Sequence, residues 1–199
     1  SVGAATTGLE AAQMMPSSSP TKGTMTDGIW ADAAEQIWID GAGNRFVNEY
    51  AERDVLAKAS LALDRGVFYI IYAGRGDPGN PGMMIKGTTK DARIRDMVEG
   101  NHIWYGSTLA ELAEASNKPA AGCTPRFTER QLRETIERYN AAVAAQKDPD
   151  FGKEVLAGAI DLAYIESHDD VGICISPRKA SLHHTMGGVH INEYAQVLN

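Results

Sequence analysis

The segment that begins at Thr128 constrains the fold more than any other part of the chain. Its apolar residues recur at spacings of 4, 3 and 4 positions, which places them on one side of a helix: Leu132, Ile136, Tyr139 and Val143. Thr128 and Gln131 have the spacing of a capping box, in which each side chain bonds the other residue's backbone amide. A long helix with a single apolar stripe is stable only against an apolar layer, so the remaining elements must supply one.

Strand and helix signals are intermingled along the rest of the chain. The uninterrupted apolar run at residues 67–72 predicts a strand that is buried on both faces. Turn-forming residues 40–44 lie between two short β-prone runs and predict a hairpin. The same kinds of signal predict strands at 172–175 and 189–191, and helices over 52–65 and 88–99. Because no regular β-α-β alternation connects these elements, we expect the α+β class rather than a doubly wound sheet.

Residues 1–28 differ in composition from the rest of the chain. They are rich in Gly, Ala, Ser, Thr and Pro, so we expect an irregular segment with at most a short helix over residues 9–15 that ends at Pro16. Residues 29–199 are expected to form one domain. The chain opens without an initiator Met or a signal-peptide pattern, and we interpret it as a fragment of a longer protein.

Charge and hydropathy argue against several classes of partner. The 26 acidic residues outnumber the 19 basic ones and give a net charge of −7, whereas binding to nucleic acid or anionic lipid requires a basic surface. No apolar run reaches the roughly 18 residues of a membrane span, so we expect no membrane insertion. The two cysteines, Cys123 and Cys174, are too few for a disulfide scaffold and are expected to be buried.

Residues 74–79 match the G-x-G-x-x-G pattern of dinucleotide-binding proteins. That chemistry needs a tight turn that opens a helix, whose N-terminal amides hold a pyrophosphate. Pro78 and Pro81 prevent a helix from beginning there. We therefore interpret this match as accidental and expect no dinucleotide fingerprint in the chain.

The densest cluster of functional residue types is residues 183–188, with the sequence His-His-Thr-Met-Gly-Gly. Adjacent residues of a strand point to opposite faces, so His183 and His184 are not expected to bind one metal ion together, and no metal site is predicted. Two interpretations remain. Either one histidine donates a hydrogen bond to a substrate oxyanion while the glycines admit a flat ligand, or the segment is a turn with surface histidines.

Two arginines also have alternative interpretations. Arg53 either binds a ligand carboxylate or pairs with Glu49 or Glu52. Arg178 and Lys179 form a local positive spot in an acidic chain, which is either a carboxylate site or, as we expect, a solvated face.

Four segments of the chain, taken in order, resemble one family. They are residues 43–54 (GNRFVNEYAERD), 135–140 (TIERYN), 147–152 (KDPDFG) and 183–189 (HHTMGGV). They resemble the fumarate reductase/succinate dehydrogenase flavoprotein superfamily, and within it the soluble flavocytochrome-type fumarate reductases. In that family this stretch is the capping, or clamp, domain, an α+β unit inserted into the FAD-binding domain. The resemblance implies that residues 29–199 are such a domain, that residues 1–28 lead out of the FAD-binding domain, and that the FAD-binding Rossmann-like domain is absent from this chain.

The resemblance also implies roles for individual residues. Arg53 would donate a proton to the substrate and His184 would hold a substrate carboxylate, so these two are the expected catalytic residues. Thr26 and Asp27 would join His184 in binding the substrate. The cofactor would be FAD, held by the intact parent protein and not tightly by this chain alone. The residues expected beside it are Met186, Gly187 and Gly188.

The reaction implied by the resemblance is reduction of the C=C bond of fumarate or a related α,β-unsaturated carboxylic acid. Hydride from reduced flavin adds to one alkene carbon, and the carbanion character left beside the carboxylate requires a proton at once. The implied partners are this small acid and the FAD-binding domain of the same parent protein, in a prokaryotic cytoplasm or periplasm. The chain departs from the family at Ser19, where the pattern has a catalytic His, and at residues 30–31, where a relay Arg is missing. A non-catalytic binding or scaffolding module derived from the domain is the alternative.

Overall fold

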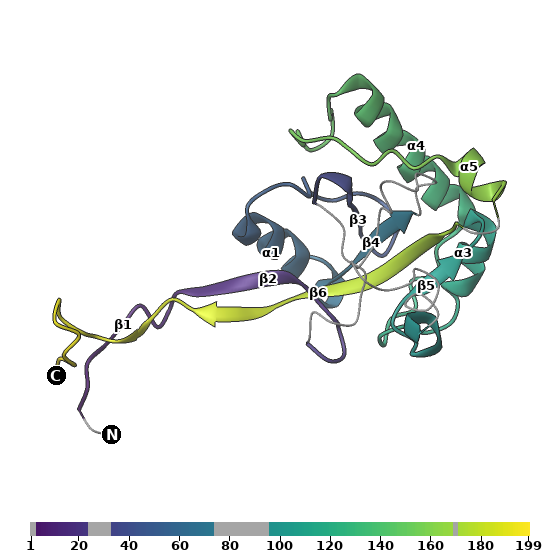
Figure 1. Cartoon of the computed structure of the whole chain (residues 1–199). Helices are drawn as coiled ribbons and strands as arrows, with labels where there is room; N and C mark the ends of the chain where they lie inside the picture. Colours follow the sequence, from purple (N-terminus) through teal and green to yellow (C-terminus); the bar gives the residue numbers. More distant parts are fainter. Residues whose placement is uncertain (1–2, 24–32, 74–95, 169–170) are drawn as a thin grey trace.

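The computed structural model describes residues 3–23, 33–73, 96–168 and 171–199. Its centre is a five-stranded sheet in the order β2-β6-β4-β3, with β5 also paired to β6 (Figure 1). The strands are β2 (Ala12–Ser18), β3 (Ile37–Ile39), β4 (Val67–Ala73), β5 (Trp104–Gly106) and β6 (Ile173–Thr185). All the described strand pairs are antiparallel. The expected mixture of helices and strands without a doubly wound sheet is confirmed for the described residues.

Strand β6 organises the molecule because it has different neighbours along its length. Residues 173–179 pair with β4 on one edge, while the other edge pairs first with β5 and then with β2. Beyond Lys179 only β2 remains, so β2 and β6 leave the sheet as a two-stranded ribbon (Figure 1). Strands β1 (Thr6–Thr7) and β7 (Gly188–Val189) extend this ribbon, and both ends of the chain lie together at its tip.

One face of the sheet carries the larger core. Val67, Tyr69 and Ile71 of β4 point into it, as the uninterrupted apolar run predicts. Three helices cover this face: α3 (Leu109–Ala115), α4 (Glu129–Ala145) and α5 (Leu162–Glu166). The capping box of Thr128 and Gln131 at the start of α4 is present, and the predicted stripe is inward, with Val143 at its edge.

The opposite face carries a smaller core built on the alternate residues of β4. Phe68 stacks on Trp38 of β3 with ring centroids 4.4 Å apart. Helix α1 (Arg53–Leu61) packs on this side through Leu56. The helix is shorter than the predicted 52–65, because a 3-10 turn, Asp64–Gly66, leads into β4 instead. Cys123 and Cys174 are both buried and unpaired by a disulfide, as expected.

The N-terminal segment differs from its prediction. Residues expected to be a short helix and irregular chain form β2 and pair with β6. Pro16 does not prevent this, because β2 lies at the edge of the sheet and the ladder is irregular between Met15 and Ser18, where a missing N–H costs no hydrogen bond. The hairpin prediction at 37–47 is confirmed by the antiparallel bridge between Ile39 and Arg45.

Candidate functional site

Arg53 and His183 both contact the side chain of Gln13, which the sequence analysis did not single out. Arg53 is the first residue of α1, and its Nη1 lies 3.3 Å from Oε1 of Gln13 on β2. The same Gln13 oxygen lies 3.0 Å from Nδ1 of His183 on β6. The structure therefore brings the predicted arginine and the His-His segment together at the start of the ribbon.

The two adjacent histidines lie close together, which corrects the prediction that they point to opposite faces. Gln13 pairs with His184 and Met14 with Leu182, so His183 is an extra residue in the ladder. Such a β-bulge rotates the side chains of its strand and breaks the simple alternation. The ring centroids of His183 and His184 are only 4.5 Å apart. Arg53, Gln13, His183 and His184 thus form one group, called here the ribbon cluster.

A pocket of about 490 Å³ lies beside the ribbon cluster, between α1 and β2. Its lining contains two cations, Arg53 and Lys58. Lys58 is paired with Asp54 at 3.0 Å, and this hydrogen bond holds the pKa of Asp54 below its usual value. Arg53 instead meets the neutral Gln13, so its charge is available to an anion. The full lining is Ala12, Gln13, Met14, Glu52, Arg53, Asp54, Ala57, Lys58 and Leu61.

Three predicted site residues follow the histidines at the turn between β6 and β7. Met186 is 65% exposed, and a side chain at Gly188 would meet open space. Gly187 is different: a Cβ there would lie 2.1 Å from the backbone of Gly8. Gly187 therefore lets the two segments of the ribbon approach each other closely, in addition to any contact with a ligand.

Other predicted positions divide into described and undescribed ones. Thr26, Asp27 and the accidental motif at 74–79 lie outside the described residues. Ser19, where the resemblance leads us to expect a histidine, is 2% exposed, and its Oγ lies 3.4 Å from the hydroxyl of Thr21. Its side chain is part of the turn that follows β2.

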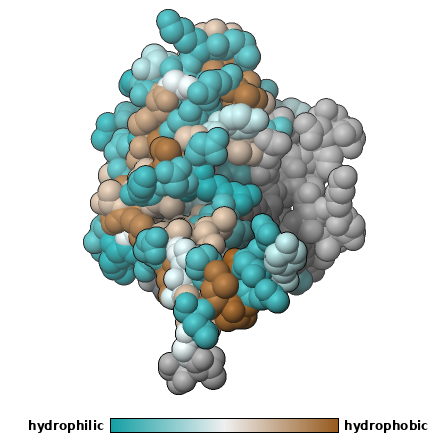
Figure 2. Space-filling view, turned by 90° about the vertical axis from the view of Figure 1, so that its left-hand side faces the viewer, coloured by the Kyte–Doolittle hydropathy of each residue, from teal (hydrophilic) through white to brown (hydrophobic). Residues whose placement is uncertain are grey.

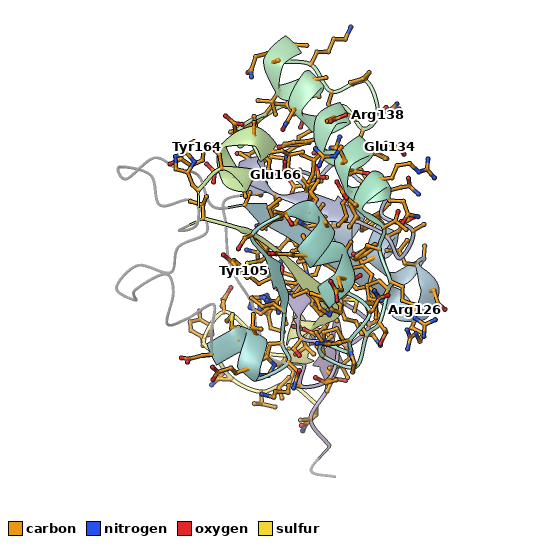
Figure 3. The ribbon with its side chains drawn as sticks, turned by 90° about the vertical axis from the view of Figure 1, so that its right-hand side faces the viewer. Tyr105, Arg126, Glu134, Arg138, Tyr164 and Glu166 are labelled. Atoms are coloured by element: carbon orange, nitrogen blue, oxygen red, sulfur yellow. The ribbon has the colours of Figure 1, made fainter. Side chains whose placement is uncertain are left out.

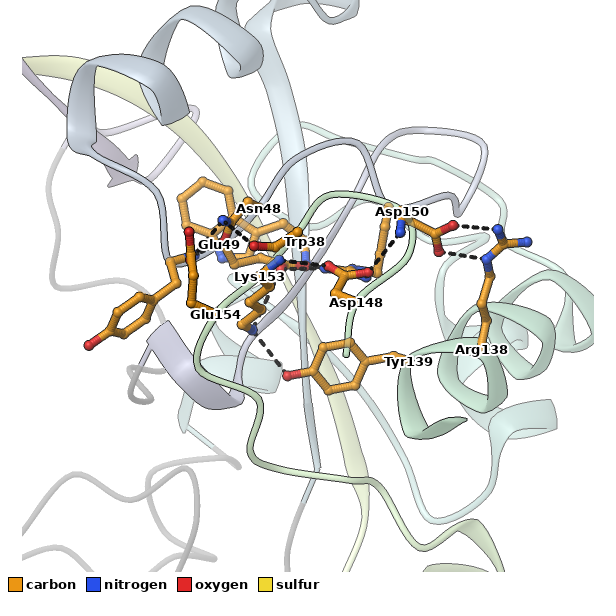
Figure 4. A network of polar contacts seen from close by, with 12 residues as sticks. Trp38, Asn48, Glu49, Arg138, Tyr139, Asp148, Asp150, Lys153 and Glu154 are labelled. Atoms are coloured by element: carbon orange, nitrogen blue, oxygen red, sulfur yellow. Dashed lines mark hydrogen bonds and ion pairs between the residues drawn. The ribbon is translucent and has the colours of Figure 1, made fainter. Parts of the chain in front are cut away.

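Two of the segments that carry the family resemblance, 43–54 and 147–152, contribute side chains to a buried polar network (Figure 4). Arg45 forks onto two carboxylates: Nη2 lies 2.8 Å from Glu49 Oε2 and 3.0 Å from Asp148 Oδ2. Lys153 Nζ lies 3.5 Å from Glu49 and donates to the hydroxyl of Tyr139 at 3.0 Å. Two cations thus offset two anions, and all four charged side chains are at most 5% exposed.

The ionisation of this network follows from burial and hydrogen bonding together. Burial alone would raise the pKa of Asp148, but hydrogen bonds from Arg45 and from backbone amides lower it to about 2. Burial alone would lower the pKa of Arg45, and its two carboxylate partners raise it above its usual value. Burial lowers the pKa of Lys153, with Glu49 opposing the shift.

Arg178 is a correction to the expected solvated face, because it is 1% exposed. It lies on β6 and interacts with Tyr72 of β4. Burial raises the pKa of Tyr72 above its usual value, and the Arg178 guanidinium opposes part of this shift. Both neighbours received one interpretation from the sequence, whereas in the structure Arg178 is buried and Lys179, the next residue, is only partly buried. Gln13 was missed altogether, since an isolated glutamine in a segment expected to be irregular carries no local signal.

Two kinds of feature are absent from the part of the chain that the structure describes. It contains no group of three or more His, Cys, Asp or Glu residues arranged to hold a metal ion. None of its helices is long and apolar enough to cross a bilayer.

Comparison with known proteins defines the class to which this fold and cluster belong. A family model described as FAD binding domain matches residues 1–199, and the chain belongs to this family of flavoproteins. It is 31% identical to NADH:acrylate oxidoreductase of Vibrio harveyi, over 98% of the chain and 17% of that protein. It is 28% identical to a fumarate reductase (cytochrome) of Shewanella frigidimarina, over 99% of the chain and 29% of that protein.

The fold has a counterpart among solved structures. The open conformation of a flavocytochrome c3 fumarate reductase matches with a TM-score of 0.65 and 24% identity, over 99% of this chain and 30% of that one. The chain therefore spans less than a third of the length of these relatives. The resemblance to the fumarate reductase flavoproteins, noted from four segments, is confirmed.

FAD is the cofactor of this family, and the described residues supply only part of what it requires. A dinucleotide pyrophosphate is held at a helix that follows a strand through a glycine-rich turn. Of the helices whose beginnings are described, only α3 directly follows a strand. The amide of Glu111 in its first turn donates to the side chain of Thr108, and the amide of Ser107 before the helix donates to the side chain of Glu111. The start of α3 is therefore not a dinucleotide site. The predicted contact of Met186, Gly187 and Gly188 with the cofactor stays a prediction.

Proposed function

We propose that this chain is the substrate-clamping part of an FAD-dependent reductase that saturates the C=C bond of an α,β-unsaturated carboxylic acid. The observation that carries the proposal is the ribbon cluster, in which Arg53 and Gln13 line a pocket of about 490 Å³ and the two histidines adjoin Gln13. Relatives named for acrylate, urocanate and fumarate share one substrate feature, an alkene conjugated to a carboxylic acid. We propose that the substrate of the protein that carries this chain has the same feature.

In this proposal the chain's residues bind the acid and supply the proton. His184 holds a substrate carboxylate, and Arg53 donates a proton to the carbon beside it. The guanidinium favours developing negative charge and remains protonated at neutral pH, so a proton is available whenever substrate is bound. The flavin, held by the FAD-binding domain of the parent protein, supplies hydride when bound.

Further residues complete the proposed cleft. Thr26 and Asp27 join His184 in binding the substrate, and the segment Met186, Gly187 and Gly188 lies against the cofactor. The domain boundary follows the same logic: residues 29–199 form the capping domain and residues 1–28 lead out of the FAD-binding domain. The ribbon supports this arrangement, since β1 and β7 leave the body side by side, as the two connections of an inserted unit would (Figure 1).

The experiment is a reductase assay on the full-length protein that carries this chain, with reduced dye as donor and acrylate, fumarate or urocanate as acceptor. Arg53→Ala should lower kcat at least about a hundredfold, the usual scale for a lost proton donor, while FAD content stays unchanged. Arg130→Ala is the matched control, because Arg130 is an exposed arginine of α4 paired with Glu134. Equal activity of the two variants would contradict the proposed role.

A non-catalytic binding module is the second candidate, favoured by one observation. Ser19 occupies the position of the family's catalytic histidine, and its side chain is buried in a turn. In that case the full-length protein should bind an unsaturated acid in calorimetry and reduce none of the three acids with any donor. Turnover of one of them would exclude the module.

A further inference from the structure

We propose that Gln13 is a positioning residue, which fixes the proton-donating arginine and sets the tautomer of His183 through one shared oxygen. The inference rests on the proposed function for its catalytic meaning. Its structural basis is the pair of contacts at Gln13 Oε1, 3.3 Å to Arg53 Nη1 and 3.0 Å to His183 Nδ1.

The identity of the Gln13 atom follows from the chemistry of its partners. A guanidinium has only donors, so the amide atom that faces Arg53 must be the oxygen and not the NH₂ group. That oxygen can only accept, so the His183 nitrogen that contacts it must carry a proton. When His183 is neutral, its Nδ1 is therefore protonated and its Nε2 is left as an acceptor.

This tautomer matters because His183 lies against His184. Their rings are 4.5 Å apart, so a fixed orientation of His183 limits the orientations open to His184, the proposed carboxylate ligand. The bulge supports the same arrangement, since the backbone of Gln13 is paired with His184 while its side chain reaches His183. Gln13 thus connects α1 to both histidines, and its proposed effect on the reaction acts through Arg53 and this histidine pair.

The neutrality of Gln13 is the second part of the inference. A carboxylate at this position would form a charge-assisted pair with Arg53 and offset the positive charge that attracts an acid. An amide holds the guanidinium in place by a hydrogen bond and leaves its charge for the ligand. The other cation of the pocket, Lys58, is already paired with Asp54, which leaves Arg53 as the pocket's cation for an anionic ligand.

The first test reads the tautomer of His183 directly and does not depend on any reductase activity. Long-range ¹H–¹⁵N NMR of the chain, at a pH where histidine is neutral, should show the Nδ1–H form for His183. Gln13→Leu should return His183 to the Nε2–H form, and Gln13→Glu should keep Nδ1–H because a carboxylate also accepts. His168 is the internal reference, since its Nδ1 lies 2.7 Å from the Tyr164 carbonyl and neither residue contacts Gln13. An Nε2–H tautomer in the wild type, or no change in Gln13→Leu, would overturn the inference.

The second test separates charge from position in the full-length protein. Gln13→Glu should raise KM for fumarate roughly tenfold with a smaller change in kcat, because the offset charge weakens binding. Gln13→Leu should lower kcat more than it raises KM, because Arg53 loses its anchor. Two variants with the same modest change in both constants would contradict a positioning role. A protein that shows the tautomer pattern and reduces no acid would refute the proposed function and leave the tautomer assignment in place.

Discussion

Arg45 and Arg53 come from one short segment and occupy opposite environments. Arg45 is buried between Glu49 and Asp148, and its charge is paired with these two carboxylates. Arg53 lies at the surface of a pocket and meets only a neutral amide among its described side-chain contacts. The segment that identified the family therefore encodes a structural cation and a candidate chemical one. Sequence pattern alone could not separate them, because both are arginines followed by acidic residues within a few positions.

The buried network makes Arg45 a strong determinant of stability. Arg45→Met should lower the free energy of unfolding by about 3–5 kcal/mol, because it leaves two buried carboxylates without their partner. Arg138→Met is the control, since Arg138 pairs with Asp150 on the outer face of α4 (Figure 3) and should cost less than about 1 kcal/mol. Urea denaturation of both variants measures the difference. Equal losses would show that burial does not govern these pairs.

The same network predicts how stability depends on acid. The pKa of Asp148 is about 2 in the fold and near 3.8 when unperturbed, so its stabilising contribution is complete above the higher value and is lost as pH falls toward the lower one. At 1.36 kcal/mol per pKa unit, this contribution is about 2 kcal/mol.

Asp148→Asn removes this titration and provides the comparison. The difference in unfolding free energy between the wild type and the variant should shrink by about 2 kcal/mol between roughly pH 5 and pH 2. Chemical denaturation across that range measures it. A difference that stays constant with pH would mean that Asp148 does not titrate as described.

At the scale of elements, local signals predicted α4 and β4 well and β2 not at all. A capping box and an apolar stripe belong to one segment, so α4 follows from its own residues. Strand β2 exists because β6, far along the chain, offers an edge to which Gln13 and its neighbours pair. The bulge at His183 depends on the same long-range pairing, and it is what places both histidines together. The site is thus less predictable than the core because its geometry depends on pairing between distant segments.

The close approach of Gly187 to Gly8 in the ribbon gives a test at this scale. Gly187→Ala should open the ribbon, because its Cβ would lie 2.1 Å from the backbone of Gly8. Amides that bridge the ribbon, such as those of Met186 and His190, should then exchange with solvent at least about tenfold faster, while amides of β4 stay protected. Gly188→Ala is the matched control, since its Cβ would meet open space. Unchanged protection in Gly187→Ala would contradict the close approach.

At the scale of the whole molecule, the ribbon carries a group of exposed apolar side chains. Figure 2 faces the end of the ribbon and shows hydrophobic surface in the lower part of the view, with further hydrophobic patches higher on the molecule. The exposed apolar side chains of this region are Leu9, Leu182, Met186, Val189, Ile191, Tyr194 and Val197. Exposed apolar side chains that adjoin one another on a surface are typical of an interaction site. In the proposed function it is the surface that meets the FAD-binding domain of the same parent protein.

The last prediction concerns what this chain does alone. In the proposed function the chain supplies one wall of a cleft, and Arg53, His183 and His184 are exposed and therefore hydrated without an opposing wall. Exposed ion pairs contribute only about 0–1 kcal/mol each, and a millimolar Kd corresponds to about 4 kcal/mol, so fumarate should bind with a Kd in the millimolar range or weaker. FAD should also bind weakly, because the described residues provide no dinucleotide site. Calorimetric titration with FAD and with fumarate, beside an assay with reduced dye, measures all three properties. Micromolar binding of FAD or turnover by these 199 residues would show that the chain carries a complete site.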